Sequence, residues 1–406
     1  MLELISITLI KIIILCAGLM TAAAYFVLLE RRIAAWVQDR RGPNRVGIPL
    51  TRIKLFGLGQ PLADGLKFIF KEEFTPAQVD KVMYTLAPIS ILTTALAIFA
   101  VIPFGDVLPL WGEKPIELVV VPNFDAGVIY IFALSSLAVY GVLLGGWASN
   151  NKYSLLGGMR STAQLIAYEL PLSLGLLGVV LAVGSLRLET IIGAQASSGW
   201  WFALTQPLGL IVFLIASYAE AARLPFDLPE AEQELIGGYH TEYSSIRLLM
   251  YLVAEFLHMI TASFLIVILF FGGWSLWGLT SPGFWGVEGE AIPLWLGIVR
   301  IGVLMSKIVL VILFFMLSRW TWPRFRFDQL MALAWKVMLP LGIANLIIVA
   351  VLAEYRAPLV ERLGEGGVIA LTWSLSILAM LLAAVLIPLH SDNRKQLSAP
   401  DLFGLP

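Results

Sequence analysis

A series of apolar runs, each of about 18 residues or more, recurs along the whole chain and constrains its fold more than any other feature. A bilayer core of about 30 Å is crossed by about 20 apolar residues in an α-helix. Of the 406 residues, 59% are apolar and 14% are charged, whereas a soluble domain carries roughly 25% charge. The short alternating segments of a membrane barrel are absent. The sequence predicts an all-α integral membrane protein.

The apolar runs predict a polytopic bundle of about eight or nine transmembrane helices, with a single membrane domain over residues 1–406. The expected spans are residues 4–28, 84–104, 126–148, 161–184, 201–221, 248–272, 295–318, 333–353 and 368–389. The first run resembles a signal peptide in its small residues, but Glu3 precedes it and "ERR" follows it. We therefore expect it to be a retained span.

The placement of Lys and Arg predicts the orientation in the membrane. Most of the 27 basic residues fall in the loops 30–81, 149–160, 222–247 and 319–332 or after residue 390. The opposite loops hold only Lys114, Arg187, Arg356 and Arg362. Because basic loops stay on the cytoplasmic side, we expect a protein of the cell inner membrane with its N-terminus outside and its C-terminus in the cytoplasm.

Residues 60–71, "QPLADGLKFIFK", predict a helix that lies in the membrane interface rather than across it. Gln60, Asp64 and Lys67 share one helical face, and Leu62 and Leu66 lie on the opposite face. This spacing is typical of an interfacial amphipathic helix. A solvated connector is the alternative interpretation.

The sequence offers no ligands for a redox metal centre. It contains one cysteine, Cys16, and three widely spaced histidines, His240, His258 and His390, with no CxxC and no paired-histidine spacing. Phosphate-cradling and dinucleotide-binding glycine motifs are also missing. We expect no metal site and no cofactor bound by this chain, so that any redox chemistry belongs to another chain.

Three carboxyls fall inside the predicted spans, where an unpaired charge is costly. Glu169 lies in the fourth span beside Pro171, Glu220 ends the fifth, and Glu255 shares a face of the sixth with His258 at i, i+3. Burial and like-charged neighbours favour the neutral form of a carboxyl. Such groups can take up and release protons, which is the chemistry we expect of them. Snorkelling or local pairing is the structural alternative.

The segment "PFDLPEAEQELIGGYHTEY" at residues 225–243 concentrates acidic residues on the side that is rich in cations. Its members are Asp227, Glu230, Glu232, Glu234 and Glu242. Arg223 and Arg247 flank it. We expect these acids to begin a path of carboxyls that continues at Glu169, Glu220 and Glu255. A solvated acidic loop that contacts a basic partner is the alternative.

Five long stretches resemble the quinone-channel membrane subunit of respiratory complex I, the proton-pumping NADH:quinone oxidoreductase. They are "ERRIAAWVQDRRGPNRVG" at 30–47, "GLGQPLADGLKFIFKE" at 57–72, "GWASNNKYSLLGGMRSTAQLIAYELPL" at 146–172, "PFDLPEAEQELIGGYHTEYS" at 225–244 and "PRFRFDQLMALAWKVMLPL" at 323–341. The resemblance implies a subunit that encloses most of a quinone tunnel and docks the membrane arm to the soluble arm. It implies partner subunits that carry FMN and iron–sulfur clusters, with quinone as the substrate and membrane lipid around the chain.

The same resemblance implies roles for particular residues. The residues expected at the tunnel or the interface with the soluble partner are Arg31, Arg40, Gln60, Asp64, Gly65, Lys67, Arg223, Arg324 and Arg326. Many relatives have alanine where this chain has Gly65, which implies a roomier lining. The acids at 225–243 are expected to respond to quinone reduction, and Glu169, Glu220 and Glu255 to carry that response onward.

Three functions remain as alternatives at this point. The first is a subunit that couples quinone reduction to proton translocation through buried carboxylates. The second is a free-standing ion transporter, although the broken helices and matching halves of such folds are not seen. The third is an anchor for a peripheral enzyme, such as the homologous subunit of a membrane-bound hydrogenase complex. The buried acids favour the first.

Overall fold

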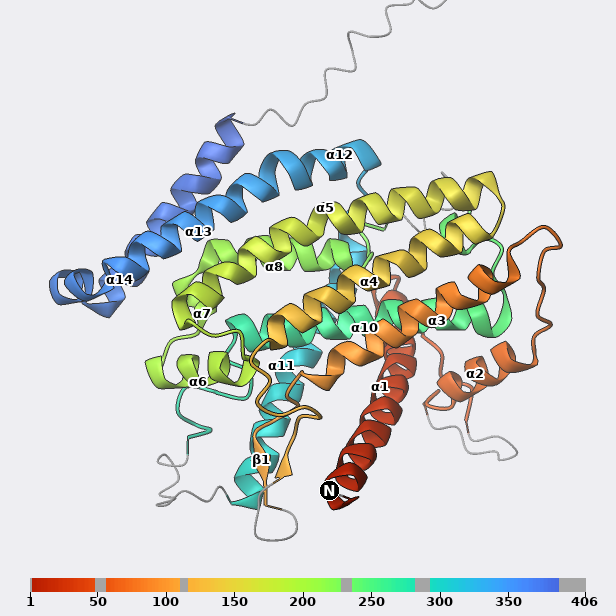
Figure 1. Cartoon of the computed structure of the whole chain (residues 1–406), viewed down its shortest axis with the longest axis horizontal. Coiled ribbons are helices and arrows are strands. Elements are labelled where there is room, and N and C mark those ends of the chain that lie inside the picture. Colours follow the sequence, from red (N-terminus) through yellow and green to blue (C-terminus); the bar gives the residue numbers. More distant parts are fainter. Residues whose placement is uncertain (1, 48–55, 110–115, 228–235, 282–292, 387–406) are drawn as a thin grey trace, which may run out of the picture.

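The computed structural model describes residues 2–47, 56–109, 116–227, 236–281 and 293–386. The long helices are α1 (Leu2–Val37), α3 (Lys81–Ala97), α4 (Gly127–Ala148), α5 (Lys152–Val183), α10 (Ser245–Phe270), α11 (Leu294–Thr321) and α14 (Arg356–Leu386). The shorter ones are α2 (Gln60–Phe70), η1 (Ile98–Ala100), α6 (Leu188–Ser198), α7 (Phe202–Thr205), α8 (Pro207–Glu220), η2 (Gly238–His240), α12 (Phe327–Ala332), η4 (Leu333–Met338) and α13 (Leu339–Glu354). Two short strands, β1 (Val107–Leu108) and β2 (Ile116–Glu117), pair antiparallel with Val107 opposite Glu117. Figure 1 shows these elements along the chain.

Eight helical stretches are long and apolar enough to cross a membrane, which confirms the predicted polytopic helical fold. One of them, Phe327–Glu354, is continuous through α12, η4 and α13. The predicted span 201–221 differs, because it divides at Gln206 into the 4-residue α7 and the 14-residue α8. Pro207 begins α8, since proline fits a first helical turn but has no N–H with which to continue the preceding helix.

Several helices extend beyond the predicted spans into segments that we expected to be loops. α5 begins at Lys152, inside the predicted loop 149–160, because the Asn151 side chain caps it and accepts a hydrogen bond from the Tyr153 amide at 3.0 Å. α1 likewise continues to Val37. Polar residues at helix ends therefore continue the helices past the apolar core of the membrane.

The last helix, α14, begins at Arg356, ahead of the predicted span 368–389. It is kinked at Gly364, where φ is 72°, a backbone conformation that glycine adopts at little cost. α14 folds back beside α13 at one end of the bundle (Figure 1).

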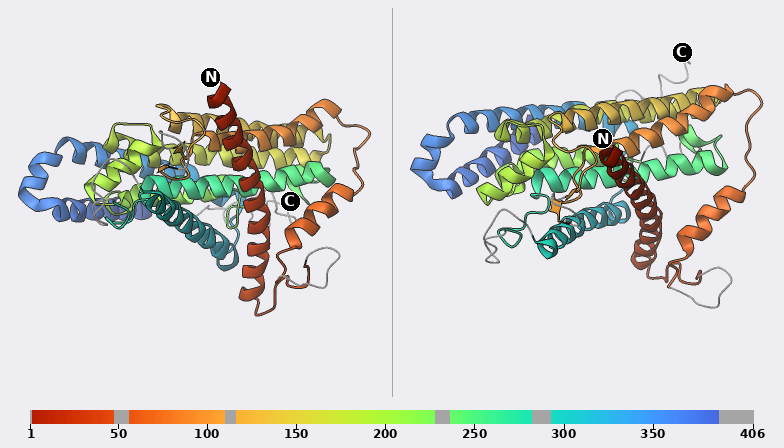
Figure 2. Two further views of the ribbon diagram at one scale, coloured as in Figure 1. Left: turned by 90° about the horizontal axis from the view of Figure 1, so that it is seen from below. Right: turned by 60° about the horizontal axis from the view of Figure 1, so that its bottom comes forward.

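The amphipathic segment at 60–71 forms α2, as predicted. Leu62, Leu66, Ile69 and Phe70 are all exposed in the isolated chain, which suits a helix whose apolar face meets lipid. α2 contacts α1 and α10. Figure 2 shows α1 running obliquely past the bundle, with α2 beside its C-terminal end.

The core of the fold is α10. In its most apolar stretch of 18 residues, 78% of the residues are buried, and the helix packs against α1, α3, α8 and α11. Its C-terminal end is held by Lys307 of α11, whose Nζ donates to the carbonyls of Phe271 at 2.7 Å and Ser275 at 2.6 Å. A cation at this position complements the partial negative charge of a helix C-terminus. α10 is therefore the helix around which the other elements pack.

Candidate functional site

A large cavity opens where α1, α2 and α10 meet. It has a volume of about 640 Å³, within the range of roughly 300–1,000 Å³ that is usual for ligand sites. Its apolar lining comes from α1, α2 and α10 and includes Met20, Ala24, Val27, Phe68, Leu252 and Phe256. Five residues predicted for the tunnel, Arg31, Arg40, Asp64, Gly65 and Arg223, lie in its wall. We call this space the tunnel cavity.

A buried ionic group lies in one wall of the tunnel cavity. The Glu30 carboxylate is 3.2 Å from Arg223 Nη1 and also pairs with Arg319. The Arg223 guanidinium lies 4.2 Å from the centre of the Phe256 ring, in a cation–π contact. Two cations face one anion in this group. Within the described residues, Arg223 Nε and Nη2 are buried and have no hydrogen-bond partner, so the group holds more donors than its one carboxylate satisfies.

The polar face of α2 converges on Asp64. Arg31 of α1 is 2.6 Å from one Asp64 carboxylate oxygen. Gln60 donates to the other at 3.0 Å, and Lys67 is 3.5 Å from it. The three polar residues predicted to share one helical face therefore do so, and through Arg31 they fasten α2 to α1 at the wall of the tunnel cavity.

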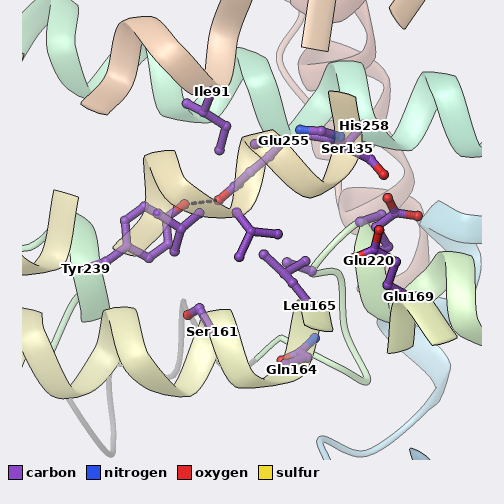
Figure 3. Close-up of a pocket in the computed structure, with 15 residues that line it drawn as sticks. Ile91, Ser135, Ser161, Gln164, Leu165, Glu169, Glu220, Tyr239, Glu255 and His258 are labelled. Carbon is purple, nitrogen blue, oxygen red and sulfur yellow. Dashed lines mark hydrogen bonds between the residues drawn. The ribbon is translucent and has the colours of Figure 1, made fainter. Parts of the chain in front are cut away.

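A second, smaller cavity contains all three carboxyls that were predicted inside spans. Glu169 comes from α5, Glu220 from α8 and Glu255 from α10, and they line a space of about 50 Å³, enough for a few water molecules. Figure 3 shows Glu255 pointing toward Tyr239, whose hydroxyl donates to Glu255 Oε1 at 3.1 Å. Glu169 and Glu220 lie together at the other end. We call this space the carboxyl cavity.

The carboxyl cavity has polar neighbours beyond these acids. Ser135 and His258 lie near Glu169 and Glu220 (Figure 3), and the Ser136 hydroxyl donates to Glu169 Oε1. Among the described residues, neither Glu169 nor Glu220 has an ion-pair partner. No permanent ion pair with a described residue therefore fixes the charge state of these two acids.

Three cavities follow one another along a single face of α10. Glu255 lines both the tunnel cavity and the carboxyl cavity. His258 lines the carboxyl cavity and a third, narrow space of about 10 Å³ that also includes Thr261 and Leu265. Steps of three and four residues keep side chains on one helical face. α10 thus places a titratable group at each of the two boundaries between these spaces.

The predicted acids of the 225–243 segment are only partly placed by the structure. Asp227 is 1% exposed and lies 3.4 Å from Arg324 Nη2. Glu242 accepts a hydrogen bond from Asn151 Nδ2 at 2.6 Å and does not line either cavity as described. The prediction that these acids form one path with the three buried carboxyls includes Glu230, Glu232 and Glu234, which lie outside the described residues.

Arg324 and Arg326 lie before α12, in the loop predicted at 319–332. Arg324 pairs with Asp227, and the Arg326 amide donates to Gln329 Oε1 at 3.2 Å, which caps α12. Neither arginine is among the described residues that line the tunnel cavity. Their placement suits the predicted interface with a partner rather than the tunnel.

The turn η2 is held against α5 by a contact that only glycine allows. A Cβ at Gly157 would lie 2.6 Å from Gly238 Cα and 3.0 Å from the Tyr239 amide nitrogen. Tyr239 is 2% exposed and packs edge-on against Tyr251 of α10, with ring centres 5.1 Å apart. Burial raises the pKa of Tyr243, in the same segment, to about 12, so the Tyr243 hydroxyl stays protonated. By packing against α5 and Tyr251, the turn presents the Tyr239 hydroxyl to Glu255.

Replacing Gly157 by alanine is expected to displace η2 and to break the bond between Tyr239 and Glu255. Overpacking of this kind costs about 1–3 kcal/mol, and here the strain falls on the turn. Rates of coupled turnover in assembled complexes should fall severalfold. The control is Gly302→Ala on α11, where a Cβ meets nothing within 4 Å. Equal rates in both variants would show that the position of η2 is unimportant.

Some site residues were not predicted as such from the sequence. His258 was noticed for its i, i+3 spacing from Glu255 but was given no role. Glu30 follows an apolar run directly in "ERR", and that position was its only sequence signal. Tyr239 and Ser135 gave no signal, because their importance comes from contacts between segments that are distant in the chain.

Comparisons with known proteins agree with this architecture. The family model described as NADH dehydrogenase matches residues 10–350. A relative from Thermus thermophilus, "NADH-quinone oxidoreductase subunit 8", is 46% identical over 86% of this chain and 87% of its own length. The protein of the same description from Rhodothermus marinus is 43% identical over 84% and 95%. A further NADH-quinone oxidoreductase subunit, from Leptospira biflexa, is 44% identical over 85% and 94%.

Proposed function

The chain belongs to the NADH dehydrogenase family, and from this premise we propose that it is the membrane subunit of a proton-pumping NADH:quinone oxidoreductase that guides quinone and couples its reduction to proton movement. In this proposal the neighbouring subunits carry the FMN and iron–sulfur clusters, and this chain holds no redox group. The chain spans the cell inner membrane with its N-terminus outside. The names of the relatives favour this assignment over a free-standing transporter or a hydrogenase anchor.

The tunnel cavity is the part that takes the quinone. Its aliphatic and aromatic lining suits an isoprenoid tail, because apolar surface is stabilised by about 25 cal/mol for each Å² removed from water. The wall formed by Glu30, Arg223 and Arg319 suits the polar ring, since two cations there face one anion and a quinone carbonyl oxygen is electron-rich. The ring passes this wall on its way to the soluble subunits, where it is reduced.

The observation that carries the coupling proposal is the position of Glu255. This one carboxyl lies in the wall of the tunnel cavity and in the wall of the carboxyl cavity. A change of charge in the first space therefore acts directly on a titratable group of the second. A unit charge about 8 Å away changes the energy of a carboxylate by about 2 kcal/mol at an effective dielectric constant of about 20, which shifts its protonation equilibrium more than tenfold.

The mechanism then follows the order of the cavities. Reduction of the quinone creates negative charge and a demand for protons near the tunnel. Glu255 changes its protonation state, and its field acts across the carboxyl cavity on Glu169 and Glu220. Water in that cavity carries protons between the carboxyls, and His258 continues the series toward the third space. The acids at 225–243, with Asp227 and Glu242 among them, respond from the cytoplasmic side.

Mapping of a photoreactive, long-tailed quinone in the assembled complex tests the proposal. We expect crosslinked peptides from the three parts of the tunnel wall, which are residues 20–40, 61–68 and 249–256. Excess unlabelled quinone should abolish the crosslinks. Crosslinks confined to the far side of the bundle, for example to α13 and α14, would contradict the assignment of the tunnel.

A further inference from the structure

A groove lies between the hairpin of α13 and α14 and the part of the bundle beside it, although α13 also packs directly against α5 and α8. Its other wall comes from α6, α7 and the adjoining ends of α5 and α8. The groove has a volume of about 330 Å³, and no described residue lines both it and the tunnel or carboxyl cavity. Most of α14 is not covered by the rest of the chain, because only 11% of the residues in its most apolar stretch are buried.

The polarity of the groove changes with depth in the way that a phospholipid requires. Arg356, Glu365 and Trp200 lie at the mouth, where α13 ends and α14 begins. One or two turns deeper, α13 contributes Leu352 and α14 contributes Ile369. Tryptophan and charged residues mark the level of the headgroups, and aliphatic side chains the level of the acyl chains. The mouth lies on the side opposite the basic loops.

Two residues that line the groove also have a buried polar atom without a hydrogen-bond partner among the described residues. Within the described part of the chain, the Thr205 hydroxyl is buried without a hydrogen bond. Gln206 is 5% exposed, and its Oε1 has no partner there. Both residues line the groove. A buried polar group without a hydrogen bond costs about 1–3 kcal/mol, so the wall of the groove is not purely apolar at this depth.

The charges at the mouth select among headgroups. Arg356 and Glu365 form a loose ion pair at 3.8 Å, with side chains 60% and 49% exposed, and such surface pairs contribute little by themselves. A headgroup with a phosphate and a primary ammonium can pair with both residues at once. An anionic headgroup would place a second negative charge beside Glu365. A quaternary ammonium would have no N–H to donate to the carboxylate.

We propose that this groove binds a zwitterionic phospholipid of the ethanolamine type. Its phosphate pairs with Arg356, its ammonium pairs with Glu365, and one acyl chain lies between α13 and α14. The lipid thereby attaches the last helix to the bundle. This site is separate from the proposed quinone path and does not depend on it.

The test uses an ethanolamine phospholipid with a photoreactive acyl chain, incorporated with the intact complex into lipid nanodiscs. We expect crosslinked peptides from residues 194–206 and 349–372. Excess unlabelled ethanolamine lipid should remove these crosslinks, whereas glycerol and choline phospholipids should compete about tenfold less well. Arg356→Gln and Glu365→Gln should each lower the crosslinking yield about five- to tenfold.

Matched controls lie on the same short segment of α14. Arg362 and Glu361 are exposed and are not among the described residues that line the groove, so Arg362→Gln and Glu361→Gln should leave the yield unchanged. Equal competition by all three lipid classes would reduce the site to an ordinary shell of boundary lipid and overturn the proposal. Absence of crosslinks from both peptides would also overturn it, since another subunit would then fill the groove.

Discussion

Replacing Glu255 by glutamine is expected to lower the number of protons pumped per quinone reduced by about tenfold or more. Glutamine keeps the shape of the side chain, and its amide oxygen can still accept a hydrogen bond from Tyr239. It cannot take or release a proton, and proton transfer by a positioned side chain contributes roughly 10²–10⁴-fold to such steps. The measurement compares proton uptake with quinone reduction in sealed membrane vesicles that contain the assembled complex.

An uncoupler separates loss of pumping from loss of the complex. With the uncoupler present, the Glu255→Gln complex should still reduce quinone, because the tunnel wall keeps its shape. Glu361→Gln provides the control, since it makes the same chemical change at an exposed position of α14. If the Glu255→Gln complex pumps protons at the wild-type ratio, this carboxyl is not the link between the two cavities.

Replacing Gly65 by phenylalanine is expected to block the tunnel cavity. A Cβ at Gly65 would meet nothing within 4 Å, and Gly65 lies in the wall of the cavity, so a phenyl group can enter the cavity without displacing α2. Reduction of a long-tailed quinone should fall by about tenfold or more, corresponding to at least about 1.4 kcal/mol. Electron transfer from NADH to a water-soluble acceptor, which bypasses the tunnel, should be unchanged.

The matched control at this position is Gly65→Ala. The methyl group also meets open space and removes little of the 640 Å³ of the cavity, so activity with long-tailed quinone should stay close to that of the wild type. A short-tailed quinone should be less affected by Gly65→Phe than a long-tailed one. If Gly65→Phe reduces the long-tailed quinone normally, the substrate does not pass this point.

The tunnel cavity and the carboxyl cavity treat their acids in different ways. Glu30 is paired with two arginines, and removing one member of such a buried ion cluster leaves the others uncompensated. Glu169 instead accepts a hydrogen bond from a serine hydroxyl, a partner that suits either protonation state. In the proposed mechanism, the ion-paired acid therefore lies on the quinone path and the acids without an ion pair among the described residues lie on the proton path.

Much of the fold could be predicted because single-segment patterns determine it. The length of an apolar run identifies a span, and the face of α2 that carries Gln60, Asp64 and Lys67 identifies an amphipathic helix. Helix ends were harder to predict, since Asn151 and Pro207 act through local hydrogen bonding that hydropathy does not register. The predicted span at 201–221 is divided into two helices for this reason.

The site could be predicted only in part. A carboxyl inside an apolar span is conspicuous in the sequence, and so the sequence alone identifies Glu169, Glu220 and Glu255. Their neighbours were not found, because Tyr239 reaches Glu255 only after Gly157 lets the turn η2 approach α5. The pairing of Glu242 with Asn151 likewise joins residues that no local pattern connects.

The central claim is that reduction of the quinone changes the protonation of Glu255. Infrared difference spectroscopy of the complex, recorded between the oxidised and the reduced quinone, measures this change through the C=O stretch of protonated carboxyl groups. We predict a carboxyl band that is present in the wild type, retained in Glu361→Gln and lost in Glu255→Gln. A difference spectrum that is the same in the wild type and in Glu255→Gln would contradict the account.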